Sequence, residues 1–360
     1  MARKYKQLNN ATMTPGSAFD TEHNNLAWDQ LLLNYSATIT GTAAAITEDA
    51  AYRMMGVPEV SQAEEPIIRL EGRTLRHLSA FLSGGYCKTL QPTTGGIFAG
   101  AVLDLGKILP GTYVSGEVKT FIRGNVEGFL SYGTTLTALA GTLRPSVATV
   151  DRPAGLRHTR PLYREFTIGI PANESAQTHL MTVDQDMVSA GLFLVVRDAS
   201  AGNGGGTRVD TLVRAITLDI TRGKRGQEQH VRQTWGQLRE NTARAAGFTD
   251  LDWDEATGTV FIPFVDDTDP RWSGRMAFSE GDTILLTIDS SATIEEHLGT
   301  ALTAAAGDNM RVVRLDHQVI PGTGAAPVTA PPSARQAIAL APGVATTRRT
   351  GRRRRRRAVR

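Results

Sequence analysis

The stretch 211–288 constrains the fold more than any other part of the chain, because it combines short alternating strands with one well-marked helix. We predict a strand at Thr211–Thr221, a helix at Thr234–Ala246, and further strands at Gly258–Val265 and Asp282–Ile288. Apolar residues recur at every second position within much of these strands, which is the pattern of a sheet with one buried face. The stretch therefore predicts a β-rich fold with few, short helices.

The helix predicted at Thr234–Ala246 carries both start and stop signals. Thr234 and Gln237 match a capping box, in which the hydroxyl accepts a backbone amide proton and the glutamine reaches back to the N-cap amide. Gly247 stands where a left-handed residue ends a helix. Ile294–Ala306 shows the same signals, so it is predicted as a second helix.

Strand-like segments recur through the rest of the chain. Leu26–Thr42 fits either a short helix or a strand, and Pro66–Leu82 is predicted as a strand that runs into a short helix. Residues 97–126 and 258–289 share a weak repeat of strand, proline-containing loop, Ser-Gly and strand. This spacing of short strands favours β-sandwiches over a parallel α/β fold. Further strands are predicted at 165–170, 178–183, 188–197 and 311–320.

The charge of the chain is divided unevenly between a body and a tail. The net charge is +3, yet residues 317–360 hold ten arginines and no acidic residue, so subtracting the tail leaves −7 for residues 1–316. From Pro321 onward the sequence is rich in Ala, Pro, Gly and Thr and has no core-forming pattern. A split of this kind predicts that the tail has its own anionic partner.

The arginine run at the C-terminus is the sharpest functional signal. Guanidinium groups pair with phosphates through two hydrogen bonds and stay charged at every relevant pH. Such contacts give strong, salt-sensitive binding to nucleic acid or to an anionic lipid surface. A solvated tail or a processing remnant is the alternative. The residues predicted to contact the anionic partner are Arg348, Arg349, Arg352, Arg353, Arg354, Arg355, Arg356, Arg357 and Arg360.

The sequence carries no signature of catalysis or of a specific metal site. One acidic loop has calcium-loop spacing, but Glu255 and Phe261 occupy the positions that need glycine and a bidentate glutamate. The lone Cys87 lacks a catalytic context, and the seven histidines are scattered. We predict no enzyme activity, cofactor or metal, and leave loose cation binding open for two loops: Asp250, Asp252 and Asp254, and Asp266, Asp267 and Asp269.

Features that direct a chain to a membrane or to secretion are also missing from this sequence. A single cysteine excludes an intrachain disulfide, which fits folding in a reducing compartment. No apolar run reaches the roughly 18 residues that a membrane-spanning helix needs, and the basic N-terminus lacks the apolar core of a signal peptide. We therefore expect the protein to fold in a reducing compartment.

Several features together resemble the double jelly-roll major capsid proteins of tailless, membrane-containing icosahedral bacteriophages. They are the strand Thr211–Thr221 followed by the capped helix Thr234–Ala246, the strand GTVFIPF, the loop with Arg271-Trp272, and the segment DTILLTID. The resemblance is strongest over residues 185–320. It implies an all-β fold class with two jelly-roll sandwiches in one chain, a few short helices, an N-terminal arm and a basic C-terminal tail.

The resemblance also implies a division of the chain and a set of partners. We expect an arm at 1–29, a first jelly roll at 30–184, a second at 185–320, and a Pro/Ala-rich linker with the Arg-rich tail at 321–360. The protein would form a homotrimer with a pseudo-hexagonal footprint, assemble in a host cytoplasm and tile an icosahedral virion shell over an internal membrane. Its partners would be other copies, other virion proteins such as a penton, and membrane lipid or nucleic acid at the tail.

Two other functions fit the same residues. A minor capsid or fibre protein that binds a receptor or glycan would show discrete lobes and an exposed aromatic cluster. A nucleic-acid-binding protein would use the β-body only to present the basic tail, and it would stay monomeric or dimeric.

Overall fold

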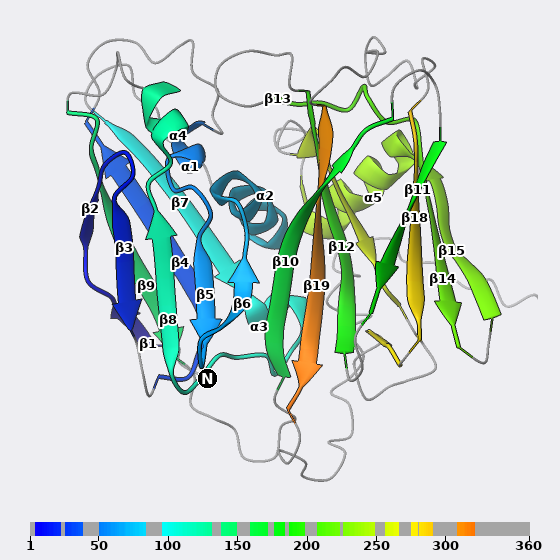
Figure 1. Cartoon of the computed structure of the whole chain (residues 1–360), viewed down its shortest axis with the longest axis horizontal. Helices are drawn as coiled ribbons and strands as arrows, with labels where there is room; N and C mark the ends of the chain where they lie inside the picture. Colours follow the sequence, from blue (N-terminus) through cyan, green and yellow to red (C-terminus); the bar gives the residue numbers. More distant parts are fainter. Residues whose placement is uncertain are drawn as a thin grey trace, which may run out of the picture.

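Two β-sandwiches lie side by side along the long axis of the molecule, and their strands run across that axis (Figure 1). The predicted all-β class with a few short helices is confirmed. The computed structural model describes residues 4–22, 26–38, 50–83, 96–131, 138–149, 159–171, 176–183, 187–198, 207–223, 226–248, 256–265, 275–279, 281–290 and 308–320.

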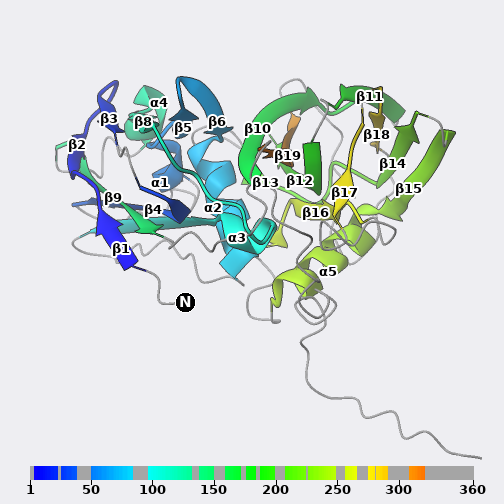
Figure 2. The same cartoon turned by 90° about the horizontal axis from the view of Figure 1, so that it is seen from below.

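The first sandwich packs two sheets, with strand orders β1-β9-β4-β7 and β3-β8-β5-β6, and the short strand β2 also pairs with β9. Figure 2 shows these sheets as two layers. The strands are β1 (Lys4–Gln7), β2 (Ala11–Met13), β3 (Ala18–Glu22), β4 (Trp28–Ala37), β5 (Glu59–Gln62), β6 (Glu65–Arg69), β7 (Ile97–Asp104), β8 (Val118–Arg123) and β9 (Gly141–Thr149).

The second sandwich repeats this arrangement, with strand orders β10-β19-β12-β16 and β11-β18-β14-β15. The short strands β13 and β17 pair with β12 beside β16. The strands are β10 (Thr159–Gly169), β11 (Ala176–Thr182), β12 (Met187–Asp198), β13 (Thr207–Arg208), β14 (Ala215–Arg222), β15 (Gly226–Thr234), β16 (Thr259–Pro263), β17 (Met276–Ala277), β18 (Thr283–Asp289) and β19 (Asn309–Val319).

The equivalence of the two sandwiches extends to their helices. Helix α2 (Gly72–Ser83) connects β6 to β7, and α5 (Trp235–Ala246) connects β15 to β16 at the matching place. The weak sequence repeat at 97–126 and 258–289 therefore corresponds to β7–β8 and β16–β18, and the strand order confirms it. Among the described residues, the remaining helices are α1 (Ala50–Arg53), α3 (Leu105–Ile108) and α4 (Val126–Ser131), all in the first half.

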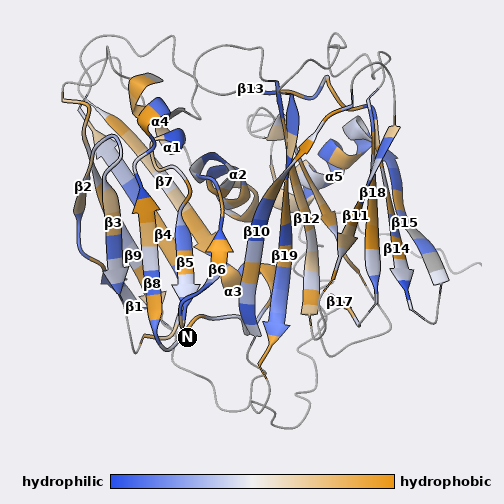
Figure 3. Ribbon diagram, viewed as in Figure 1, coloured by the Kyte–Doolittle hydropathy of each residue, from blue (hydrophilic) through white to orange (hydrophobic). Residues whose placement is uncertain are grey.

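Each sandwich has a hydrophobic cluster, and the first cluster extends into the second sandwich through residues such as Phe193 and Val313. Trp28 and Tyr35 are fully buried in the first, and Trp235 and Phe264 are buried in the second. Hydrophobic and hydrophilic residues alternate along strands such as β8 and β14, so one face of each strand points into the core (Figure 3). Burying each large side chain stabilises the fold by roughly 1.5–3 kcal/mol.

The predicted helix signals are confirmed in detail. The Thr234 hydroxyl accepts the Gln237 amide proton at 3.3 Å, and the Gln237 side chain accepts the Thr234 amide proton at 3.2 Å. Gly247 follows the helix with φ of 74°, the left-handed conformation that glycine adopts without strain. Pro66–Leu82 also forms the predicted strand and helix, as β6 and α2.

Other expectations need correction. The ambiguous segment Leu26–Thr42 forms the long strand β4, and no helix is seen in its described part. Residues 4–22, expected as an extended arm, form β1 to β3 and pair with β9 and β8. The strand β15 was not predicted, because its sequence GQEQHVRQT is polar apart from Gly226 and Val231 and shows no apolar alternation. At the edge of a sheet such a strand needs no apolar face.

The division of the chain after residue 184 stays a prediction. Strand pairing argues for an earlier division, between Thr149 and Thr159, because β10 and β11 belong to the sheets of the second sandwich. Their residues Ile168 and Met181 also lie in the second hydrophobic cluster.

Several predicted features lie outside the described residues: the helix at 294–306, both aspartate loops, Cys87, the loop with Arg271-Trp272, and the tail at 321–360. In the part of the chain that is described, no helix is both long and apolar enough to cross a membrane.

Candidate functional site

Helix α2 forms the junction between the two sandwiches. Its residues from Gly72 to Ala80 are all buried. The Phe81 ring near its end packs on the second sandwich, with its centroid 4.9 Å from that of Phe261 and 5.9 Å from that of Phe193. Beside the helix, β6 and β10 pair in parallel and join the two sandwiches into one continuous sheet. The junction is therefore a packed interior.

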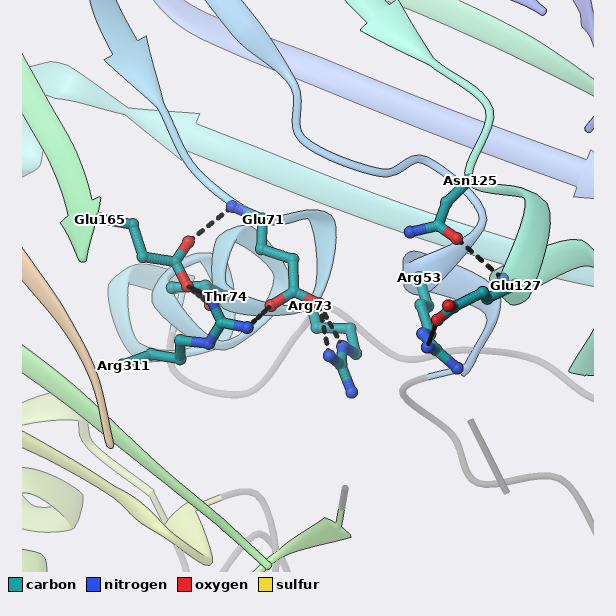
Figure 4. A network of polar contacts seen from close by, with 9 residues as sticks. Arg53, Glu71, Arg73, Thr74, Asn125, Glu127, Glu165 and Arg311 are labelled. Atoms are coloured by element: carbon teal, nitrogen blue, oxygen red, sulfur yellow. Dashed lines mark hydrogen bonds and ion pairs between the residues drawn. The ribbon is translucent and has the colours of Figure 1, made fainter. Parts of the chain in front are cut away.

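A carboxylate from the second sandwich caps this helix. Glu165 on β10 accepts the backbone amide proton of Glu71 at 2.6 Å and the Thr74 hydroxyl proton at 2.9 Å (Figure 4). The first amides of a helix have no partner within it, and the positive end of the helix dipole favours a negative charge. Glu165 thus satisfies the N-terminus of α2 across the junction.

Three arginines surround the second carboxylate, Glu71. Arg73 contacts it at 2.5 Å, and Arg311 on β19 lies 3.6 Å from Glu71 and 3.7 Å from Glu165. Burial by itself raises the pKa of Glu71, but Arg73, Arg197 and Arg311 together lower it below its ordinary value. Burial, and then the charge of Glu71, raise the pKa of Glu165. The junction therefore holds one firmly ionised carboxylate beside one that resists ionisation.

Replacing Glu165 by alanine is expected to lower the free energy of unfolding by about 1–3 kcal/mol, because the Glu71 amide and the Thr74 hydroxyl lose a buried acceptor. Glu165→Gln keeps one acceptor oxygen and should cost less. Urea unfolding measures both. Glu59→Ala is the matched control, since Glu59 is partly exposed and lies 3.7 Å from the exposed Arg69, and its loss should cost less than about 0.5 kcal/mol. Equal losses for Glu165→Ala and Glu59→Ala would contradict the capping role.

A second buried polar cluster lies at the end of the molecule where β19 stops. His317 is completely buried; its Nδ1 lies 3.1 Å from the Thr112 hydroxyl and its Nε2 lies 3.3 Å from the Tyr163 hydroxyl. Thr112 also shares a 2.7 Å hydrogen bond with Thr159. Burial, with a smaller effect of the nearby Arg275, lowers the pKa of His317 to about 3. The ring is therefore neutral in the folded protein.

These clusters support packing more directly than chemistry. Both junction carboxylates are engaged in helix capping and ion pairs. Within the described ranges, no group of three or more His, Cys, Asp or Glu is placed to hold a metal ion. Sequence reasoning missed the junction, because Glu71 and Glu165 lie 94 positions apart and neither belongs to a motif. The nine arginines predicted to contact an anionic partner lie outside the described residues.

Comparisons with known proteins give a consistent answer for the fold. No protein-family profile matches the chain, and no curated protein matches it. Solved structures do match: the major capsid protein of Sulfolobus turreted icosahedral virus superposes with a TM-score of 0.63 at 12% identity, covering 89% of this chain and 97% of that one.

Two further structures share the fold. The major capsid protein P2 of bacteriophage PM2 has a TM-score of 0.54 at 9% identity, covering 90% of this chain and 100% of that one. A chain of the PBCV-1 virus capsid has a TM-score of 0.57 at 12% identity, covering 90% and 96%. Together with the repeated strand order, these matches show that the chain has the double jelly-roll fold found in viral major capsid proteins.

Proposed function

We propose that this protein is a major capsid protein that builds an icosahedral virion shell. The observation that carries the proposal is the match of both sandwiches, over about nine tenths of the chain, to capsid proteins of three different viruses, each 12% or less identical to this chain. The proposal has no catalytic step. The proposed function is assembly, in which surface contacts between copies of the chain hold the shell together.

The proposed unit of assembly is a homotrimer in the shell of a tailless, membrane-containing bacteriophage, put together in the host cytoplasm. Two similar sandwiches per chain support this unit, because three copies present six similar faces and can occupy a pseudo-hexagonal site. A fibre or receptor-binding protein is less well supported, since the two sandwiches are joined by one continuous sheet and are not separate lobes.

The tail is proposed to face the interior of the shell. Paired residues link the start of β1 to the end of β19 across one end of the molecule. Lys4 pairs with Thr149, Thr149 with Trp28, and Trp28 with Val114; two positions before Val114, Thr112 pairs with Thr159, which pairs with Val319. Figure 1 shows this shared end at the bottom. Since β19 ends there, the tail starts at that end of every copy. It would then meet membrane lipid or genome, while other virion proteins such as a penton fill remaining contacts.

Removing six of the nine tail arginines that are predicted to contact the anionic partner is expected to weaken the interior contact strongly and leave the trimer intact. Replacing Arg352 to Arg357 by serine should remove about six phosphate contacts, and with them a salt dependence with a slope of about −5 in log K against log salt. Sedimentation of the full chain with anionic vesicles and, separately, with DNA at two salt concentrations measures this loss and identifies the partner.

The matched control replaces the same six arginines by lysine, which keeps the charge and should keep most of the binding. Full binding by the serine variant to both vesicles and DNA would contradict the proposal for the tail. A salt-independent monomer by light scattering would contradict the assembly proposal itself.

A further inference from the structure

The two equivalent helices differ in how much of their surface is covered. Helix α2 is buried on all sides, because the second sandwich covers the face that its own sandwich does not. Helix α5 buries one face on its own sandwich through residues such as Leu238 and Thr242. Its other face is exposed at Gln237, Glu240, Asn241 and Arg244. Helix α5 therefore lacks the second packing surface that α2 has.

Hydrogen bonds fix the equivalence residue by residue. The Ser79 hydroxyl in α2 accepts the amide proton of Val102 at 2.7 Å, and the Thr242 hydroxyl in α5 accepts that of Phe261 at 2.8 Å. Both are the eighth residue of a twelve-residue helix. Val102 on β7 thus corresponds to Phe261 on β16, and Phe81 corresponds to Arg244, two positions further along each helix.

The same equivalence identifies the surface that matches the covered face of the second sandwich. Phe193 lies opposite Phe261, and Leu32 lies opposite Val102, so Leu32 corresponds to Phe193. On the other side, Val313 lies opposite Phe193 and Ser146 lies opposite Leu32. Arg311 and Arg144 each stand two positions before these residues, so they correspond as well. In the second sandwich these positions lie against α2. In the first they form what we call the open face: Tyr5, Leu32, Asn34, Ser36, Phe98, Val102, Thr142 and Arg144.

The open face has the composition of an interface. Tyr5 is 62% exposed and Phe98 41% exposed, and Leu32 and Val102 are half-buried. Arg144 is its charged member. The outward face of the neighbouring sheet, β3-β8-β5-β6, instead carries paired charges such as Lys119 with Asp20 and Arg69 with Glu59. Depletion of charge and enrichment of aromatic residues mark protein interfaces.

We propose that the open face binds helix α5 of a second copy of this chain, in a head-to-tail contact that repeats the junction formed by α2. The proposal rests on the proposed function, since it names the surfaces that hold the assembly unit together. In this contact Arg244 lies over Leu32 and Val102, where Phe81 lies over Phe193 and Phe261 within one copy. A head-to-tail contact joins two different surfaces, so it closes into a ring of three only when successive copies are related by a pure rotation of one third of a turn.

Cross-linking between two different single-cysteine proteins tests this pairing, because such a cross-link must join two copies. Both proteins carry Cys87→Ser, which removes the single native cysteine. One adds Leu32→Cys and the other Arg244→Cys, and a short bismaleimide is applied to their mixture. We expect a cross-linked dimer from this mixture. The matched control replaces Leu32→Cys by Leu180→Cys, a leucine that is 63% exposed on β11, and should give at least tenfold less.

A charge variant gives an independent readout. Leu32→Arg places a cation against Arg244 and should shift the mass in solution toward the monomer, whereas Leu180→Arg should leave it unchanged. Trimers that show no preferential 32–244 cross-link, or that tolerate Leu32→Arg, would overturn the proposed surfaces while the capsid proposal stands. A wild-type chain that is monomeric at all concentrations would instead overturn the proposed function.

Discussion

The free energy of unfolding is expected to fall by about 1.4 kcal/mol for each pH unit between about pH 6 and pH 4 on account of His317 alone. The pKa of this residue is about 3 in the folded protein, while an unfolded histidine has an ordinary value near 6.5. Below the ordinary value the unfolded chain binds a proton that the folded protein does not bind. Stability is therefore full above about pH 6.5 and declines as the pH falls toward 3.

The surroundings of His317 explain why its ring stays unprotonated in the folded protein. Both ring nitrogens face hydroxyl groups, from Thr112 and Tyr163, and the complete burial of the ring disfavours its charged form. The charged groups around the ring come from several elements: Arg275 beside β17 opposes protonation, and Asp316 on β19 and Asp104 at the end of β7 act on its partner Tyr163. The ring also packs edge-on against Tyr163, with centroids 5.3 Å apart.

Urea unfolding of wild type and His317→Gln at several pH values measures this effect. Glutamine cannot titrate, so the free energy of unfolding of the variant should change with pH less steeply than that of wild type, by about 1.4 kcal/mol per pH unit. The carboxylates contribute equally to both proteins and cancel in this comparison. The control is His230→Gln, because His230 lies partly exposed on β15 and its ring contacts the Pro263 carbonyl oxygen at 3.0 Å. Parallel pH profiles for wild type and His317→Gln would show that His317 is not the acid-sensitive group.

The position of His317 connects this chemistry to the tail. Two residues separate it from Ile320, after which the basic tail starts, and its partner Thr112 belongs to the first sandwich. Protonation of His317 at low pH would weaken its contact with Thr112, and with it the packing between the end of β19 and the first sandwich. The predicted pH slope is therefore a property of the end of the molecule where β19 stops.

Local patterns in the sequence predicted the capped helix and several of the alternating strands, mainly in the second half of the chain. The capping box of Thr234 and Gln237 and the stop at Gly247 are decided by neighbours a few residues apart, and they are seen as predicted. Alternation in β14 and β18 works for the same reason, since each strand has one buried face. The strand β15 shows the limit: its pairing with β14 comes from tertiary structure, which a polar edge sequence does not report.

The junction around α2 could not be predicted, because its contacts join residues that are far apart in the sequence. Glu165 caps a helix that begins far away in the sequence, and the burial of α2 follows from the docking of a whole second sandwich. The repeat was visible at 97–126 and 258–289 only as a layout, because the equivalent residues are as different as Val102 and Phe261. Backbone bonds to Ser79 and Thr242 reveal it once the structure is known.

Removing the Asp210 carboxylate should produce the largest loss of stability of any single polar substitution discussed for this chain, about 3–5 kcal/mol. Asp210 is buried and pairs with Arg239 of α5 at 2.6 Å. It also accepts the Trp235 indole proton and the Gly258 amide proton, each at 2.8 Å. Asp210→Ala leaves the buried Arg239 guanidinium without this carboxylate and breaks the tie between α5 and the start of β16.

A double-mutant cycle separates the ion pair from general damage. Asp210→Ala and Arg239→Ala should each destabilise strongly in urea unfolding, while the double variant should cost well under their sum, because it leaves no uncompensated charge. Asp20→Ala is the control: Asp20 pairs with Lys119 at 2.8 Å on an exposed surface, and its loss should leave stability unchanged. Strict additivity of the two core variants would mean that the pair acts only through packing. Since α5 is the helix proposed to dock on a second copy, a loosened α5 in Asp210→Ala should also weaken self-association at pH 7, where the fold of wild type is fully stable.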